Sequence, residues 1–339
     1  MKRFVLAAFL VAFFAAPLLA ADTVYFVDGK AKKVEITKMN ADELTVDDSG
    51  VEEKIAVNLI KSVSFNNEPS QFKTGRTYME GGSNEDALAL LKKLDPASIG
   101  DSKAMVQELD YLIAKATAGI ALGGGEVSKE NAAAVVMDFA KKNPTSFHFY
   151  EMCELAGDLC ASLGTAGGYK QAMALYEKMQ DAPSEDMKMR SSVALGRIYL
   201  AQNDTVKALK VYEQVLANKD RSAMADRQRL IATMGKAKCL ALSGKTEDAQ
   251  KMVTAVLKNS DPEDTSVNAQ GYNTLGLAYM AANKDKEAVL AFLQVDMLYY
   301  RDVACHIEAL QNLEKLWRKL EMPNRALDCV EKLKSYGVK

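Results

Sequence analysis

The sequence predicts a mainly α-helical solenoid of about seven helix-turn-helix units, preceded by a small all-β module. Two stretches, 195–215 and 275–295, place a Leu-Gly pair, a tyrosine, an alanine, an aromatic residue and a valine at identical offsets. A two-helix repeat of about 40 residues is typical of solenoids, whose units bury their apolar faces against their neighbours. From Thr23 to Phe65 the apolar residues instead alternate with a period of two, which is typical of half-buried strands.

The chain begins like a secretory signal. A basic start and an apolar run from Phe4 to Ala16 are followed by Pro17 and by small residues at Ala20 and Ala21. This order predicts a cleaved signal peptide over residues 1–21. An uncleaved anchor is the alternative, but the run is short for a bilayer span. We therefore expect an extracytoplasmic protein, periplasmic or secreted, with no integral membrane segment after cleavage.

The segment 22–66 is predicted to form the β module. Alternating apolar pairs indicate five short strands, and turn residues such as Asp28-Gly29 separate them. Five antiparallel strands in about 45 residues predict a small open barrel of the SH3-like or Sm-like kind. A barrel of this size buries little core, so we expect it to lean on the first helices. The solenoid is predicted to occupy residues 67–339.

Seven units follow one spacing. A residue of the first helix, usually small, is followed three positions later by a residue that is usually apolar or aromatic, and nine positions after that by an alanine of the second helix. Two further apolar or aromatic residues follow the alanine after another four and three positions. The units have their first positions at Gly75, Ile120, Cys160, Gly196, Ala237, Gly276 and Glu314. Small residues facing each other allow two helix backbones to approach closely, and the larger residues fill the space on either side.

This pattern resembles the tetratricopeptide repeat family. The fourth and sixth units match best, whereas the second, third and seventh depart from the pattern with Ile120, Cys160 and Glu314 in the small-residue position. The units are 36 to 45 residues apart, longer than the family repeat of about 34 residues. The resemblance implies a groove, lined by the first helix of each unit, that holds peptides or protein segments. It implies no catalytic residues.

Composition gives little support for other chemistry. Without Lys2 and Arg3, 41 of the 43 basic residues remain against 45 acidic ones, which argues against nucleic acid as a partner. The two histidines, His148 and His306, are too few and too distant for a metal cluster. Gly123-Gly124-Gly125 lacks the residues of a phosphate loop and indicates a flexible turn. We expect no catalytic, cofactor-binding or metal site.

The five cysteines are an odd number, which permits no complete disulfide framework, and we expect buried, reduced thiols.

Two surfaces are candidate binding sites. By the family register, polar residues beside the core positions of the first helices face the groove and could hold a carboxylate terminus or an acidic peptide. These residues are Arg190, Arg197, Lys238, Gln270, Asn273, Asn312, Lys315 and Arg318. A solvated face is the alternative. The helix after Lys286 has almost no polar face and is either buried or an apolar interface; its candidate residues are Leu290, Leu293, Met297 and Tyr300.

The sequence thus favours a non-enzymatic, exported scaffold that binds a protein or peptide partner in envelope or secreted-protein assembly. The alternatives are an accessory or substrate-recruiting part of a cell-wall enzyme complex and a structural homo-oligomer.

Overall fold

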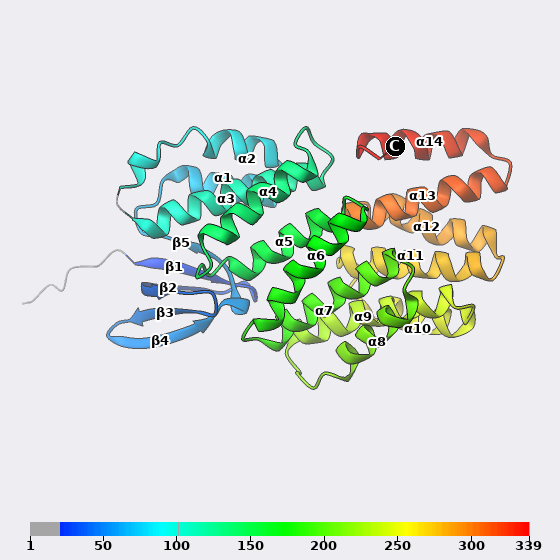
Figure 1. The fold of residues 1–339 in the computed structure, drawn as a ribbon, viewed down its shortest axis with the longest axis horizontal. Coiled ribbons are helices and arrows are strands. Elements are labelled where there is room, and N and C mark those ends of the chain that lie inside the picture. The colour runs from blue at the N-terminus through cyan, green and yellow to red at the C-terminus, as the bar shows by residue number, and fades with distance from the viewer. Residues whose placement is uncertain (1–20, 101, 339) are drawn as a thin grey trace, which may run out of the picture.

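A computed structural model describes residues 21–100 and 102–338, so almost all of the predicted signal peptide lies outside the described residues. The chain forms a sheet followed by helices arranged around a curved axis (Figure 1). The strands are β1 (Asp22–Phe26), β2 (Ala31–Met39), β3 (Glu43–Asp48), β4 (Val51–Ala56) and β5 (Ile60–Ser64), with a short 3-10 helix η1 (Val57–Leu59) before β5.

Helices fill the rest of the described chain as seven consecutive pairs. They are α1 (Ser70–Glu80) and α2 (Asn84–Leu91), α3 (Lys103–Leu122) and α4 (Lys129–Lys142), α5 (Phe149–Ala161) and α6 (Ala166–Lys178), α7 (Glu185–Ala201) and α8 (Thr205–Ala217), α9 (Ala223–Leu242) and α10 (Thr246–Asn259), α11 (Thr265–Ala281) and α12 (Asp285–Leu298), and α13 (Val303–Lys319) and α14 (Pro323–Ser335). The predicted mainly α-helical solenoid of seven units is confirmed.

The sheet is open, and the predicted barrel is wrong. Its strand order is β4-β3-β2-β1-β5 with antiparallel neighbours, and the two edge strands β4 and β5 do not pair. The physical reason is that helices, rather than its own strands, cover its apolar face: Val24, Leu44 and Val63 share one buried cluster with Phe72 of α1 and with Phe147, just before α5. The expectation that the module leans on the first helices is confirmed.

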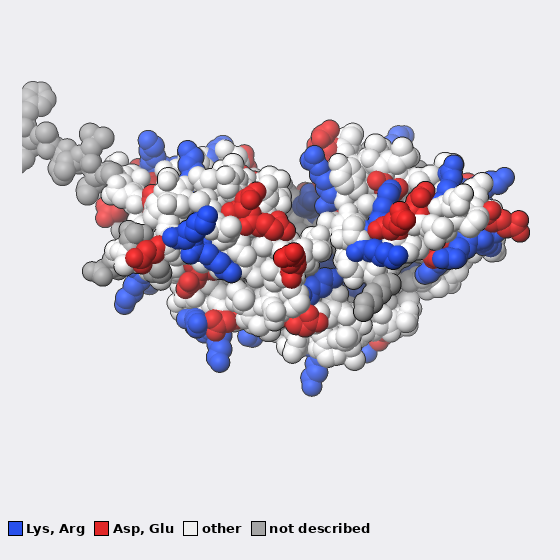
Figure 2. All heavy atoms as spheres, turned by 90° about the horizontal axis from the view of Figure 1, so that it is seen from above, with Lys and Arg blue, Asp and Glu red and all other residues white. Residues whose placement is uncertain are grey.

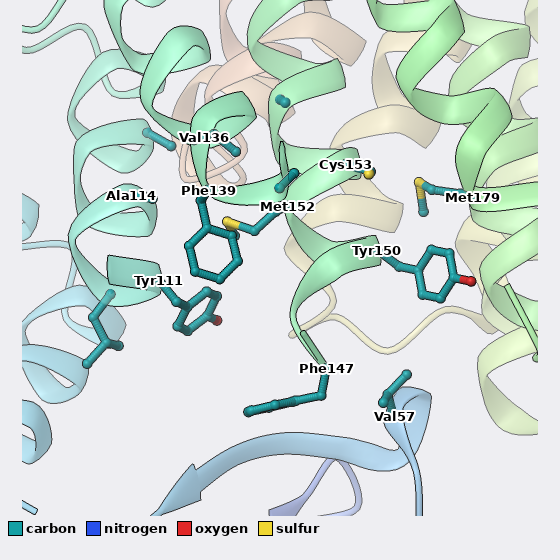
Figure 3. Close-up of a cluster of buried hydrophobic side chains, with 14 of the residues drawn as sticks. Val57, Tyr111, Ala114, Val136, Phe139, Phe147, Tyr150, Met152, Cys153 and Met179 are labelled. Carbon is teal, nitrogen blue, oxygen red and sulfur yellow. The ribbon is translucent and has the colours of Figure 1, made fainter. Parts of the chain in front are cut away.

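The sheet also contacts the starts of later odd-numbered helices. The Tyr150 hydroxyl in the first turn of α5 lies 3.4 Å from Asp42 Oδ1, and Asn58 Nδ2 in η1 donates to Asp186 Oδ1 in the first turn of α7 at 2.8 Å. Figure 3 shows Val57 of η1 near Phe147, below the buried side chains of α3 to α5. The β module therefore runs along the start of several units instead of covering one end.

In three of the helix pairs, a glycine of the first helix packs against an aromatic ring of the second helix. A Cβ added at Gly196 would lie 2.6 Å from the ring of Tyr212, and one added at Gly276 would lie 2.6 Å from that of Phe292. These are the first and fourth positions of the predicted spacing. In the third unit the glycine against Tyr176 is Gly157, at 2.5 Å, which lies one turn before the predicted Cys160.

A buried ionic network ties the joint between sheet and helices to α3 and α5. Glu108 of α3, 2% exposed, accepts from Arg76 Nη2 of α1 at 2.8 Å and from His148 Nε2 at 2.8 Å. Arg76 Nη1 also pairs with Glu68, in the joint, at 2.7 Å. Three segments distant in sequence thus meet at one carboxylate.

The turn of the second unit meets the end of the last helix. Gly124 lies in the turn between α3 and α4, as predicted for the glycine run, and has a φ of +81°. A Cβ there would lie 2.9 Å from the Cα of Tyr336, which directly follows α14. Figure 1 shows this turn beside the C-terminal end of α14. Only glycine allows two backbones to approach this closely.

All five cysteines are free and buried, as expected. Burial raises the pKa of the Cys153, Cys239 and Cys329 thiols to about 11, which keeps them protonated near neutral pH. No helix in residues 21–100 and 102–338 combines the length and apolar character needed to cross a bilayer.

Candidate functional site

The inner side of the later units contains a cavity of about 340 Å³. Four successive first helices, α7, α9, α11 and α13, line it together with Tyr212 of α8. Its lining is largely apolar and includes Leu200, Ile231 and Met234, whereas Arg197, Lys238, Gln270 and Glu308 contribute polar groups. The cavity exists because consecutive first helices stand side by side around the curved axis, which is the geometry that solenoids use for binding.

A second cavity of about 360 Å³ adjoins the first and reaches the β module. Val27 and Asn58 line it from the sheet side, and residues of α5, α7 and α9 line it from the helix side. The two cavities share Arg197, Ile231 and Ser266. We refer to both together as the groove. Figure 2 shows the surface from above, with a furrow between the N-terminal and C-terminal halves and charges of both signs beside it.

The structure brings four of the predicted polar residues to the groove: Arg190, Arg197, Lys238 and Gln270. Each cation among them already has an acidic partner on another helix. Arg190 pairs with Glu154, Lys238 pairs with Glu308, and Arg197 Nη2 lies 3.5 Å from Asp158 Oδ1. Burial and the nearby Asp158 raise the pKa of Glu154, against the effect of Arg190. The basic stripe expected from the sequence is therefore internally neutralised.

The other predicted groove residues lie elsewhere. Asn273 and Asn312 are buried, and their Nδ2 atoms donate at 2.8 Å to the carbonyl oxygens of Cys305 and Glu308, respectively. Lys315 and Arg318 are exposed on α13 but do not line either cavity. Asn273 thus links α11 to α13, Asn312 bonds within α13, and Lys315 and Arg318 face solvent, so none of the four lines the groove.

The outer face of α12 and the turn that follows it expose apolar side chains. Leu290, Met297 and Tyr300 are 63%, 67% and 48% exposed, whereas Leu293 is partly buried against the neighbouring core. The helix is thus packed on one side and apolar on the other, so it remains a predicted interface.

The two histidines both have structural partners. His148 contacts Glu108, and His306 contacts Asp296 Oδ1 at 2.8 Å through Nε2 and the Tyr336 hydroxyl at 2.9 Å through Nδ1. Cys305, its neighbour in sequence, instead lines the first cavity. The described part of the chain contains no group of three or more His, Cys, Asp or Glu side chains arranged to hold a metal ion.

Sequence reasoning missed the acidic partners and the contribution of the β module. Glu154 lies 36 residues before Arg190, and Asp264 lies 37 residues after Arg227, the fourth cation of the groove. These separations match the spacing of neighbouring units, so a search for opposite charges one repeat apart would have found both pairs. Asn58 has no such signal, because nothing local in sequence connects η1 with α7.

The comparisons with known proteins agree with this architecture. The family model described as "Tetratricopeptide repeat" matches residues 191–224, which cover most of α7, all of α8 and the start of α9. A solved tetratricopeptide repeat protein from Parabacteroides merdae aligns with a TM-score of 0.52 at 12% identity, over 80% of this chain and 93% of that one. At this identity the likeness concerns the fold alone.

A Rap protein, solved in complex with Competence and Sporulation Factor, aligns with a TM-score of 0.48 at 14% identity, over 79% of this chain and 76% of that one. No protein of curated function matches the sequence.

Proposed function

We propose that this tetratricopeptide-repeat protein is an exported, non-enzymatic scaffold that binds a segment of another protein in the groove. Proteins of this type are in general interaction scaffolds. Its role would be to assemble or present proteins of the cell envelope or of the secreted fraction.

The observation that supports this proposal is the groove itself. Two adjoining cavities of about 340 and 360 Å³ run from the β module to α13. An elongated groove with an apolar floor and polar groups along its sides suits a peptide, whose side chains enter the floor while its main chain meets the polar groups.

Filling the groove should abolish binding without unfolding the protein. Ala304 is exposed and lines the first cavity. We expect Ala304→Trp to lose the partner that the unmodified protein captures from an extracytoplasmic extract, because the indole occupies the apolar floor. Crosslinking followed by mass spectrometry measures the loss. Ala217→Trp, at an exposed position of α8 outside the groove, is the matched control and should keep the partner. Equal capture by both variants would place binding elsewhere.

Export makes a separate prediction. Asp22 must remain in the mature chain, because its carboxylate accepts from the backbone N–H groups of Asn66 at 2.8 Å and Ile36 at 3.1 Å. Cleavage before or after Ala21 meets this requirement. We expect N-terminal sequencing of the purified protein to begin at Ala21 or Asp22, and fractionation to recover it outside the cytoplasm. Recovery of Met1, or of a species that resists salt and alkaline washing of membranes, would contradict export.

A further inference from the structure

We propose that the groove accepts a protein segment that carries positive charge next to a bulky apolar side chain, and not an acidic one. This inference rests on the proposed function and concerns the chemistry of the partner. It reverses the expectation drawn from the basic residues alone.

The balance of charge in the groove favours a basic segment. The four cations of the groove, Arg190, Arg197, Arg227 and Lys238, each pair with a carboxylate of a neighbouring helix. Among the residues that line the groove, two carboxylates have no cation within ion-pair distance: Asp186 and Asp302. After internal pairing the groove therefore holds an excess of negative charge, which attracts a basic segment and repels an acidic one.

The polar atoms of the groove that have hydrogen-bonding capacity left are acceptors. Asp186 is 3% exposed and accepts from the side-chain amide of Asn58. Asp302 accepts from the backbone N–H of Cys305 at 3.1 Å, which leaves further lone pairs. Both carboxylates are acceptors, so a bound segment that pairs with them must supply donors, as Lys and Arg side chains do.

The floor of the first cavity is apolar. Tyr212, Ile231 and Met234 contribute apolar surface at its base, and a cavity of about 340 Å³ admits one aromatic or branched aliphatic side chain. The charged groups lie around this floor. A segment that fits both features pairs a bulky apolar residue with neighbouring lysines or arginines.

The test is selection of random linear 12-residue peptides against the intact mature protein, followed by affinity measurement with the enriched peptides by fluorescence anisotropy. We expect enriched sequences with a net positive charge and a large apolar residue. Their affinity should fall about tenfold for each charge-assisted bond lost in Asp186→Asn and in Asp302→Asn. Asparagine keeps the capping role of residue 302. Asp328→Asn, on the exposed face of α14, is the matched control and should change nothing.

A second variant distinguishes a groove that binds basic peptides from one that binds acidic peptides. Arg197→Gln leaves Asp158 without its cation, so a basic peptide should bind severalfold more tightly, whereas an acidic peptide would bind more weakly. Enrichment of acidic peptides that Ala304→Trp excludes would overturn this inference and leave the proposed function standing. Basic peptides that still bind Ala304→Trp would also overturn it, because they bind outside the groove. Enrichment of no peptide at all would contradict the proposed function itself.

Discussion

Gly235→Ala is expected to lower the free energy of unfolding by about 1 to 3 kcal/mol, the usual cost of overpacking a core. Alanine in place of glycine inside a helix normally gains about 0.5 to 1 kcal/mol. Here the added methyl would lie 2.3 Å from the ring of Tyr212, which is 1% exposed and already held on its other side by Gly196. The steric cost therefore exceeds the gain in helix propensity. Chemical denaturation followed by circular dichroism measures the difference.

A double-mutant cycle identifies the ring as the cause. In a Tyr212→Leu background the clash is relieved, so Gly235→Ala should become neutral or stabilising. Gly167→Ala in α6 is the matched control, since a Cβ there meets nothing within 4 Å, and stability should stay the same or rise by up to about 1 kcal/mol. An equal loss with and without the Tyr212 ring would refute the steric explanation.

Glu108→Ala is expected to cost about 3 to 5 kcal/mol, because it leaves Arg76 and His148 without their shared carboxylate in a buried site. Asp138→Ala, which breaks the exposed pair with Lys142, should cost about 0 to 1 kcal/mol and serves as the control. Thermal and chemical unfolding measure both. Similar losses for the two variants would show that the buried network contributes no more than a surface pair.

The same network makes stability depend on pH. Burial disfavours the charged imidazole, but the Glu108 carboxylate outweighs it and raises the pKa of His148 above 6.5. Burial likewise opposes ionisation of Glu108, but His148 and Arg76 outweigh it and lower its pKa below 4.5. Glu151 Oε2, 3.6 Å from Nδ1, also favours the imidazolium, and the Tyr111 ring stacks on the imidazole.

The pH dependence of stability follows from the raised pKa of His148 and the lowered pKa of Glu108. The contribution of His148 to the free energy of unfolding is fully present below pH 6.5 and is lost as the pH rises through its raised pKa. The contribution of Glu108 is present above pH 4.5 and is lost as the pH falls through its lowered pKa. Stability from this network should therefore be largest between about pH 4.5 and 6.5. His148→Gln should remove the decline on the alkaline side, and an unchanged pH profile in that variant would contradict the assignment.

Repetition made most of the fold predictable from sequence. The spacing that begins at Gly196 and Gly276 reflects the packing of one helix on the next. It recurs because the two helices of every unit pack in the same way. The alternation of apolar and polar residues in the strands likewise depends only on residues close in sequence. The barrel prediction failed because closure of a sheet depends on what covers its face, and Phe72 and Phe147 come from outside the module.

The groove was predictable only in part. Arg197 and Lys238 line the groove, but the register could not show that Asp158 and Glu308 neutralise them across helices. Nor could it show that η1 reaches α7, since Asn58 and Asp186 are 128 residues apart. Charge balance in a groove is a property of several units together, whereas a sequence pattern describes one unit at a time.

The approach of Gly124 to the end of α14 changes what determines the width of the groove. In an open array, small rotations between units accumulate independently, and the distance between the two ends is free to vary. Here the turn between α3 and α4 touches the end of α14, so a change of angle at one joint between these two units has to be compensated at another. The curvature around the groove then depends on the contact between residues 124 and 336 as well as on the packing within each helix pair.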